Sequence, residues 1–359
     1  MTRLVRAAVV AAALSLAVAA CGPGRNAPGP GASGPSASGP QGGSTQAEPP
    51  PPPEPADAPP LTAQPAGRLV PVGGAPEGVA ADPVTGLVAV GLRDPDRVAL
   101  VDGRTGTVVK EVALPESPRH LDLAAPGGPV LVPAERSNSL AQVSLPDGAV
   151  LSNTPVGRFP HNAAAGAGRV FVVNEFGSTM SVIEDGRVIE TVPTPLQPGG
   201  VAVTPSGLVG VIGVRGLALQ VYDAKTLRPV GLLDAGAGPT HVVADLENRF
   251  FVADTRGGAI LVYATDPQPV MLARVPTPGG APYGIAFDAR RGHLWVTLTA
   301  LNQVVEYAAQ GGTLRQLAVY PTVRQANSVA VDPASGRVFV AGATDGTLQI
   351  LDPEILRAA

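Results

Sequence analysis

One short pattern recurs about every forty residues from Pro76 onward, and this repeat restricts the fold more than any other feature of the sequence. Each copy begins with a marker, which consists of a proline, two variable residues and an apolar residue. The markers start at Pro76, Pro118, Pro160, Pro198, Pro239 and Pro282, and a seventh copy starts at Ala326 without the proline. Self-similarity at this period is typical of β-propellers and solenoids.

The segments inside each copy have the pattern of short β-strands. An apolar strand follows the marker, as at 79–81, and a second strand, an alternating third strand and a fourth strand come after it, as at 169–173, 180–183 and 187–192. In two copies the first turn is Asp-Pro-x-x-Gly, beginning at Asp82 and Asp332, where proline fixes φ and glycine accepts a positive φ. The period-two strands and the density of glycine and proline exclude a helical solenoid. We therefore predict an all-β fold, a seven-bladed β-propeller with four antiparallel strands in each blade.

The last copy lacks a fourth strand, because the chain ends soon after its third strand at 348–351. Residues 67–72, in front of the first marker, resemble the fourth strand at 186–192 and have no strand before them. We predict that 67–72 complete the last blade, because closing the ring removes the two free edges of an open array. The predicted propeller domain is therefore 66–359.

Residues 1–65 have the composition of an export signal followed by a tether. Arg3 and Arg6 precede an apolar run, 7–20, that is too short for a typical membrane span. The run ends at Cys21, the only cysteine, in a context that resembles the lipobox of bacterial lipoproteins; an ordinary cleaved signal is the alternative. We predict a signal peptide at 1–20, lipidation of Cys21, and a disordered tether rich in Gly, Pro and Ser over 21–65. The lipid would hold the protein on the extracytoplasmic face of the cell membrane.

The repeats are similar to those of the YVTN family of β-propellers. Residues 70–112 resemble one such repeat, and Phe171-Val172-Val173-Asn174 approximates the run that gives the family its name. The segment 178–183 after it fits the third strand of the family's repeat. The resemblance covers about residues 67–352 and implies a propeller built from repeated blades.

The markers and the loops between second and third strands are expected to open on one face, around one mouth of the axial channel. We call this face the loop face and the opposite one the turn face. Three of the four histidines, His120, His161 and His241, lie in markers, so they are candidates to bind a ligand or a divalent metal ion. Nothing in the spacing guarantees that they converge, because blades two and five lie nearly opposite. The alternative is that each histidine caps its own loop or bonds to a neighbouring blade.

Four loops between second and third strands carry an arginine at similar offsets, and acidic and amide residues lie among them. Arginine binds carboxylates and phosphates in a bidentate manner, which suits an acidic glycan or a peptide. These loops, together with the three histidines, give the candidate ligand-binding residues Arg93, Arg136, Asn174, Arg215, Asp254 and Arg256. The alternative is a solvated set of loops with mixed charges.

The remaining features restrict the function. The formal net charge is −4 and no basic block is present, so we expect no nucleic-acid partner. No nucleophile elbow, phosphate-binding loop or His-Glu-x-x-His motif is present. We therefore expect a monomeric, cofactor-free binding or scaffold module for a peptide, glycan or protein. The alternatives are a ligand sensor acting on a membrane partner, or a lactonase-like hydrolase or lyase, with or without a metal ion, using the histidines with Glu77, Glu175 or Asp254.

Overall fold

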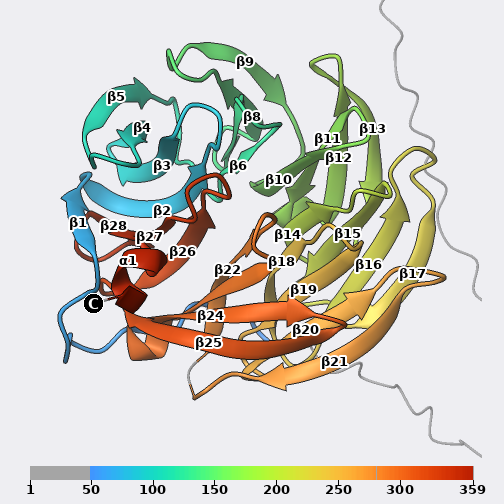
Figure 1. Ribbon diagram of the computed structural model, residues 1–359. Helices are drawn as coiled ribbons and strands as arrows, with labels where there is room; N and C mark the ends of the chain where they lie inside the picture. Colours follow the sequence, from blue (N-terminus) through green and yellow to red (C-terminus); the bar gives the residue numbers. More distant parts are fainter. Residues whose placement is uncertain (1–48, 280, 359) are drawn as a thin grey trace, which may run out of the picture. The chain divides into compact units, whose positions relative to one another are not determined.

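The computed structural model describes residues 49–279 and 281–358, and the predicted signal peptide and Cys21 lie outside the described residues. Seven four-stranded antiparallel sheets stand in a ring, so the prediction of a seven-bladed β-propeller is confirmed (Figure 1). In six of the sheets the strands follow one another in chain order from the axis outward. No helix in the described part of the chain is long and apolar enough to cross a membrane.

Six of the seven blades take all four strands from one copy of the repeat, and the last takes three. The innermost strands are β2 (Gly74–Ala81), β6 (Asp122–Leu123), β10 (Pro160–Gly166), β14 (Pro198–Val203), β18 (Pro239–Ala244), β22 (Pro282–Asp288) and β26 (Ala326–Val331). The second strands are β3 (Leu87–Asp94), β7 (Val130–Ala134), β11 (Arg169–Asn174), β15 (Leu208–Gly213), β19 (Arg249–Asp254), β23 (His293–Leu298) and β27 (Val338–Gly342).

The outer half of each blade is built in the same way. The third strands are β4 (Asp96–Asp102), β8 (Ser139–Val143), β12 (Thr179–Glu184), β16 (Ala218–Asp223), β20 (Ala259–Ala264), β24 (Gln303–Gln310) and β28 (Thr347–Leu351). The outermost strands are β5 (Val108–Ala113), β9 (Val150–Pro155), β13 (Arg187–Pro193), β17 (Pro229–Asp234), β21 (Val270–Pro276), β25 (Thr313–Pro321) and β1 (Arg68–Pro71). The 3-10 helices η1 (Glu175–Gly177) and η2 (Thr299–Leu301) and the helix α1 (Pro353–Ala358) complete the described elements.

The last blade is closed by the N-terminal strand, as predicted. β1 pairs with β28 in the sheet order β1-β28-β27-β26, with Val70 opposite Leu348. Val70 and Val72 are buried in a cluster that joins the last blade to the first, where they pack with Phe339 and other apolar residues. The closure therefore consists of backbone pairing on one side and apolar packing on the other.

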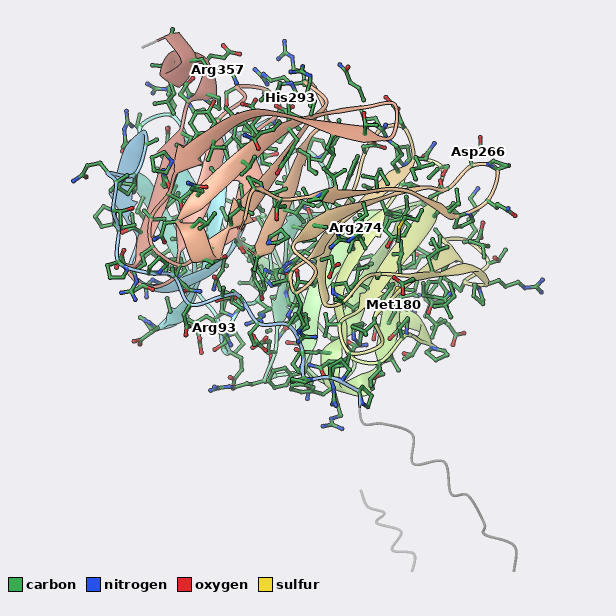
Figure 2. The ribbon with its side chains drawn as sticks, turned by 90° about the horizontal axis from the view of Figure 1, so that it is seen from below. Arg93, Met180, Asp266, Arg274, His293 and Arg357 are labelled. Atoms are coloured by element: carbon green, nitrogen blue, oxygen red, sulfur yellow. The ribbon has the colours of Figure 1, made fainter. Side chains whose placement is uncertain are left out.

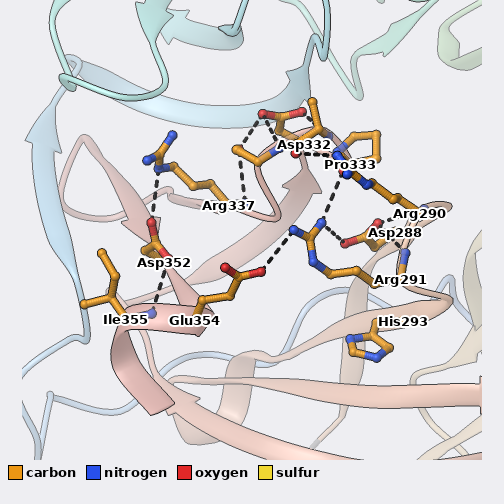
Figure 3. Close-up of polar contacts among 12 residues, drawn as sticks. Asp288, Arg290, Arg291, His293, Asp332, Pro333, Arg337, Asp352, Glu354 and Ile355 are labelled. Atoms are coloured by element: carbon orange, nitrogen blue, oxygen red, sulfur yellow. Dashed lines mark hydrogen bonds and ion pairs between the residues drawn. The ribbon is translucent and has the colours of Figure 1, made fainter. Parts of the chain in front are cut away.

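The turn face holds the predicted turn residues and the C-terminal helix. Asp82 accepts a hydrogen bond from the amide of Thr85 (2.8 Å), and Asp332 accepts one from the amide of Ala334 (2.8 Å), so both are turn formers as expected. Figure 3 shows how Arg291, in the turn of blade six, bonds to the carbonyl of Pro333 (3.2 Å) and to Glu354 of α1 (3.2 Å). These contacts attach the end of the chain to the closing blade.

Candidate functional site

A β-bulge follows the marker in six of the seven blades and directs the marker residues toward the axis. In blade three, for example, Pro160 pairs with Asn174 and Asn162 pairs with Val173, which leaves His161 as the extra residue. The same register shift occurs after Pro76, Pro198, Pro239, Pro282 and Ala326. Bulges of this kind re-aim side chains at the rims of closed sheets. The first and second residues after the marker proline therefore surround the axis at the loop end.

The three marker histidines converge on the axis, which settles the question that their spacing left open. The ring centroid of His120 lies 4.9 Å from that of His161 and 4.4 Å from that of His241. Nε2 of His241 lies 3.0 Å from Nε2 of His120. Blades two and five do lie across the ring, but the inner strands enclose so narrow an axis that their side chains meet there.

The hydrogen bonds of this histidine cluster fix the tautomers of two rings. Nδ1 of His241 lies 3.0 Å from the carbonyl oxygen of Tyr283, so it carries the proton and donates it. His241 Nε2 then accepts from His120 Nε2–H, and the remaining nitrogen of His120 faces the hydroxyl of Ser328 at 3.4 Å. Each imidazole nitrogen of this pair is thereby engaged within the protein.

All three imidazoles are neutral, because the site favours the uncharged form. Burial lowers the pKa of His120 and His161 well below its usual value, and the neighbouring histidines and Arg119 lower it further. Burial also lowers the pKa of His241 to about 4, although its bond to the Tyr283 carbonyl opposes this change. The histidine cluster is therefore a set of neutral donors and acceptors in the physiological range.

The histidine cluster does not form a metal site in this structure. Among the described residues, no group of three or more His, Cys, Asp or Glu side chains could hold a metal ion. The facing nitrogens of His120 and His241 bond to each other instead of pointing to a common centre. His161 Nε2 accepts a hydrogen bond from Nε of Arg119 (3.2 Å), which occupies that position with a cation.

Arg119 is the centre of a buried ion-pair network on the loop side of the histidines. Its guanidinium lies 3.4 Å from Glu77 and 3.3 Å from Glu135, and Glu135 also pairs with Arg93 at 2.7 Å. Burial lowers the pKa of Arg119, but the nearby Glu77, Tyr283 and Glu135 outweigh it and raise the pKa. Burial raises the pKa of Glu135 against the opposing effect of the two arginines. Arg119 therefore stays charged and balances buried carboxylates.

Part of the expected tether lies against this site. Residues 49–60, which we call the docked segment, cross the loop face and are held by side chains from several blades. Arg215 donates to the carbonyls of Pro50 (3.0 Å) and Pro49 (2.9 Å), and Arg256 donates to that of Pro51 (2.9 Å). Polar groups of the loop face therefore bond to the main chain of residues 49–60 in the expected tether.

The far end of the docked segment is fixed by blades six and seven. Arg324 donates to the carbonyl of Ala58 (3.0 Å), and Gln325 donates to that of Ala56 (3.1 Å) and accepts from the amide of Ala58 (3.0 Å). Asn302 donates to the carbonyl of Pro59 (2.9 Å). Pro53 and Ala58 are buried by these contacts.

The docked segment nearly fills the mouth. A void of only about 20 Å³ lies between it and the axial residues, lined by Pro52, Pro53 and Glu54 on one side and by Arg119, His161 and Tyr283 among those on the other. Such a void has room for about one water molecule. The carboxylate of Glu54 thus faces the ion-pair network of Arg119.

The other predicted residues have different places. Asn174 is fully buried and donates to the hydroxyls of Thr179 (3.1 Å) and Ser181 (3.0 Å), so it fixes its own blade and does not face the mouth. Asp254 is buried as well, and its carboxylate accepts bonds from backbone amides of its own and the preceding loop, including that of Gly238 (2.8 Å). Arg136 is exposed.

The fourth histidine, His293, lies at the turn face, at the opposite end of the blades from Arg93 (Figure 2). It is only partly exposed, and its Nδ1 lies 2.8 Å from the buried carboxylate of Glu306. A paired carboxylate on the neighbouring strand holds it in place.

Several residues of the site were missed in the sequence. Arg119 and Tyr283 occupy the first position after the marker proline, the position that His161 occupies in blade three. Reading this column across all blades would have found them, because the bulges direct the whole column inward. Arg324 and Gln325 precede the marker without a proline and had no signal of their own.

The comparisons with known proteins agree with the fold. The sequence matches no protein-family model and no curated protein, so membership of the YVTN family stays a prediction. Structures similar to this chain include Kuenenia stuttgartiensis hydrazine synthase (TM-score 0.68, 17% identity, 79% of this chain and 96% of that chain). A streptogramin B lyase (0.67, 14%, 80% and 96%) and virginiamycin B lyase from Staphylococcus aureus (0.64, 14%, 77% and 94%) are also similar. At these identities the likeness shows the β-propeller fold alone.

Proposed function

We propose that this protein is a lipid-anchored, extracytoplasmic binding module that receives an extended peptide on its loop face. The docked segment carries this proposal. In it, side chains of three loops donate hydrogen bonds to the main chain of an extended segment, namely Arg215, Arg256 and the adjacent Arg324 and Gln325.

The chemistry of the face fits a proline-rich peptide. Proline has no amide proton and favours the extended polyproline conformation, so its carbonyls are free acceptors in a chain that loses little entropy on binding. Most of the polar contacts to the docked segment end on its carbonyl oxygens. An acidic side chain at the position of Glu54 would lie over the Arg119 network. The ligand class is therefore an extended peptide with prolines and an acidic residue.

The membrane part of the proposal depends on the sequence around Cys21. A lipidated cysteine followed by a segment rich in Gly, Pro and Ser would keep the propeller near the membrane while its loop face meets ligands outside the cell. Labelling with a radioactive fatty acid tests this part. Label should enter the wild-type chain and not a Cys21→Ser variant.

Peptide binding is tested by exchanging the docked segment. In one variant, residues 49–60 are replaced by a Gly/Ser linker of equal length, and a fluorescent peptide with the sequence of residues 48–61 is added. Fluorescence anisotropy should show that this variant binds the peptide more tightly than the wild-type chain, whose own segment competes at high effective concentration.

Substitutions on the loop face complete the test. Arg215→Ala and Arg256→Ala in the linker variant should each lower the affinity about tenfold, because a hydrogen bond from a charged donor contributes about 1.5 kcal/mol or more. Arg228→Ala removes an exposed arginine outside the docked segment's contacts and serves as the control. If the linker variant does not bind the peptide, or if Arg215→Ala and Arg228→Ala behave alike, the proposal is wrong.

A second function, a hydrolase or lyase at the mouth, is supported by the histidine cluster next to Glu77, Glu135 and Glu175. The propeller fold is shared with streptogramin and virginiamycin B lyases. Metal analysis of the purified chain discriminates the two functions. One tightly bound divalent ion that is lost on replacing His120, His161 and His241 by alanine would favour the enzyme.

A further inference from the structure

A separate cavity lies on the other side of the histidine cluster. It has a volume of about 370 Å³, and the inner strands of all seven blades line it. His120, His241 and Ser328 form its inner end and are buried or nearly so, whereas Val203, Ala244 and Phe287 at the ends of the inner strands are partly exposed. The cavity, which we call the axial channel, therefore opens toward the turn face and is closed at its loop end by the histidines.

The axial channel has one acidic residue among the described residues that line it. Asp122, the first residue of β6, faces the channel, where the other described lining residues are mostly valine, alanine, leucine and isoleucine. Its Oδ1 accepts a hydrogen bond from the amide of Leu123 (2.7 Å). No lysine or arginine is among the described residues that line the channel. The carboxylate thus has no cation to balance it in the channel.

Comparison of the blades shows that the fold does not require this carboxylate. Asp122 stands four residues after its marker proline. The other six blades have a small apolar residue at the corresponding position, namely Ala80, Ala164, Ala202, Val243, Ala286 and Ala330. Asp122 is accessible to the solvent of the channel, but a carboxylate without a partner cation inside a protein-walled channel still costs free energy that alanine would not. A residue that departs from the pattern of the other repeats at a cost in stability is expected at functional positions.

We propose that the axial channel binds a small organic cation, an ammonium group on an apolar body, with Asp122 as its counter-ion. The volume of the channel is within the range of small-molecule sites, and its walls would contact the hydrocarbon part of the ligand. The inner end adds neutral imidazoles and the Ser328 hydroxyl, which bring no competing positive charge. A hard divalent ion fits less well, because it prefers several oxygen ligands and only one carboxylate is present.

Isothermal titration calorimetry of the full chain with hexylammonium tests the site, with hexanol as the uncharged ligand of the same length. We expect one hexylammonium per chain and at least about tenfold weaker binding of hexanol. Asp122→Ala restores the residue type of the other blades, and Asp122→Asn keeps the size of the side chain. Both variants should lose at least about tenfold in affinity for hexylammonium and none for hexanol.

A control variant and two contrary results complete the test of the axial channel. Asp185→Asn removes a carboxylate from an exposed hairpin, where asparagine also accepts the positive φ of 50°, and it should leave binding unchanged. Hexylammonium that binds no more tightly than hexanol, or equally to wild-type and Asp122→Asn protein, would overturn the proposal. The linker variant of the loop face should bind hexylammonium normally, so a failure here is distinct from a failure of peptide binding.

Discussion

The closing strand β1 allows a quantitative test of how the ring is held together. Val70 and Val72 are 6% and 4% exposed, whereas Leu69, which precedes Val70 in the strand, is 44% exposed. The double change Val70→Ala and Val72→Ala therefore removes packing at the closure while Leu69→Ala does not. These changes leave the main chain in place, so Leu69 and Val70 still pair with β28 and the amide of Val72 still donates to the carbonyl of Gly346 (2.9 Å).

The expected magnitude follows from the groups removed. Each Val→Ala change deletes two carbons, which corresponds to about 1.6 kcal/mol of transfer free energy, and the cavity left behind adds to it. The double variant should lose about 3–5 kcal/mol in free energy of unfolding, with some coupling because the two sites share neighbours. For a domain of this size the melting temperature should fall by on the order of 10 °C.

Thermal unfolding followed by circular dichroism, with size-exclusion chromatography of the folded proteins, measures both consequences. We expect Leu69→Ala to stay within about 1 °C of wild type, since an exposed apolar residue contributes little. Deleting residues 66–72 should go further and leave β28 as an open edge that promotes association. The view that β1 seals the ring would be refuted if the double variant had the same melting temperature as Leu69→Ala. It would also be refuted if the deletion variant stayed monomeric with an unchanged melting temperature.

Two further predictions concern charges near the axis. Arg119→Met should lower the free energy of unfolding by about 3 kcal/mol in urea denaturation, because the buried Glu77 would lose its cation and Glu135 would keep only Arg93. Arg136→Met on an exposed loop should change the free energy of unfolding by less than about 0.5 kcal/mol, and equal effects of the two changes would mean that the network contributes nothing. Asp122 is accessible to the solvent of the channel, but the protein that surrounds it disfavours the charged form and raises its pKa from 3.8 to about 6. The folded state then binds more protons than the unfolded state between these values, so stability falls as pH rises through this window. Near pH 4 the Asp122→Asn variant should have the melting temperature of the wild type. Its melting temperature should exceed that of the wild type increasingly up to about pH 6 and by a constant amount at higher pH. A difference in melting temperature that is the same at every pH would contradict the raised pKa.

The sequence predicted the scaffold well because the scaffold depends on local patterns. Strand alternation, the turns at Asp82 and Asp332, and the spare strand before Pro76 are each written in a few neighbouring residues. Together they define seven blades and their closure. The site depends on long-range geometry, and there the predictions were partial.

Two features explain where prediction failed. The bulges at the markers direct the residues that follow each marker proline toward the axis. Arg119 and Tyr283 occupy the same marker position as His161 and therefore belong to the site as much as His161 does. The docked segment has the composition of a disordered chain. Its order comes from distant donors such as Arg215, which lies 165 residues after its partner Pro50 in the chain. Conversely, Asn174 and Asp254 have the residue types of binding sites, but both are buried, where Asn174 bonds to the hydroxyls of Thr179 and Ser181 and Asp254 bonds to backbone amides.

Blade two concentrates the departures from the repeat, and their order along the chain matches their order along the axis. Arg119 faces the loop side under the docked segment, His120 joins the histidine cluster, and Asp122 faces the channel beyond it. The inner strand of this blade is also the shortest described, with only two residues in β6. Because the neutral histidines separate the two compartments, a cation bound at Asp122 would not neutralise the carboxylates around Arg119, and a peptide on the loop face would not reach Asp122. One segment of four residues therefore gives one propeller two chemically different ends.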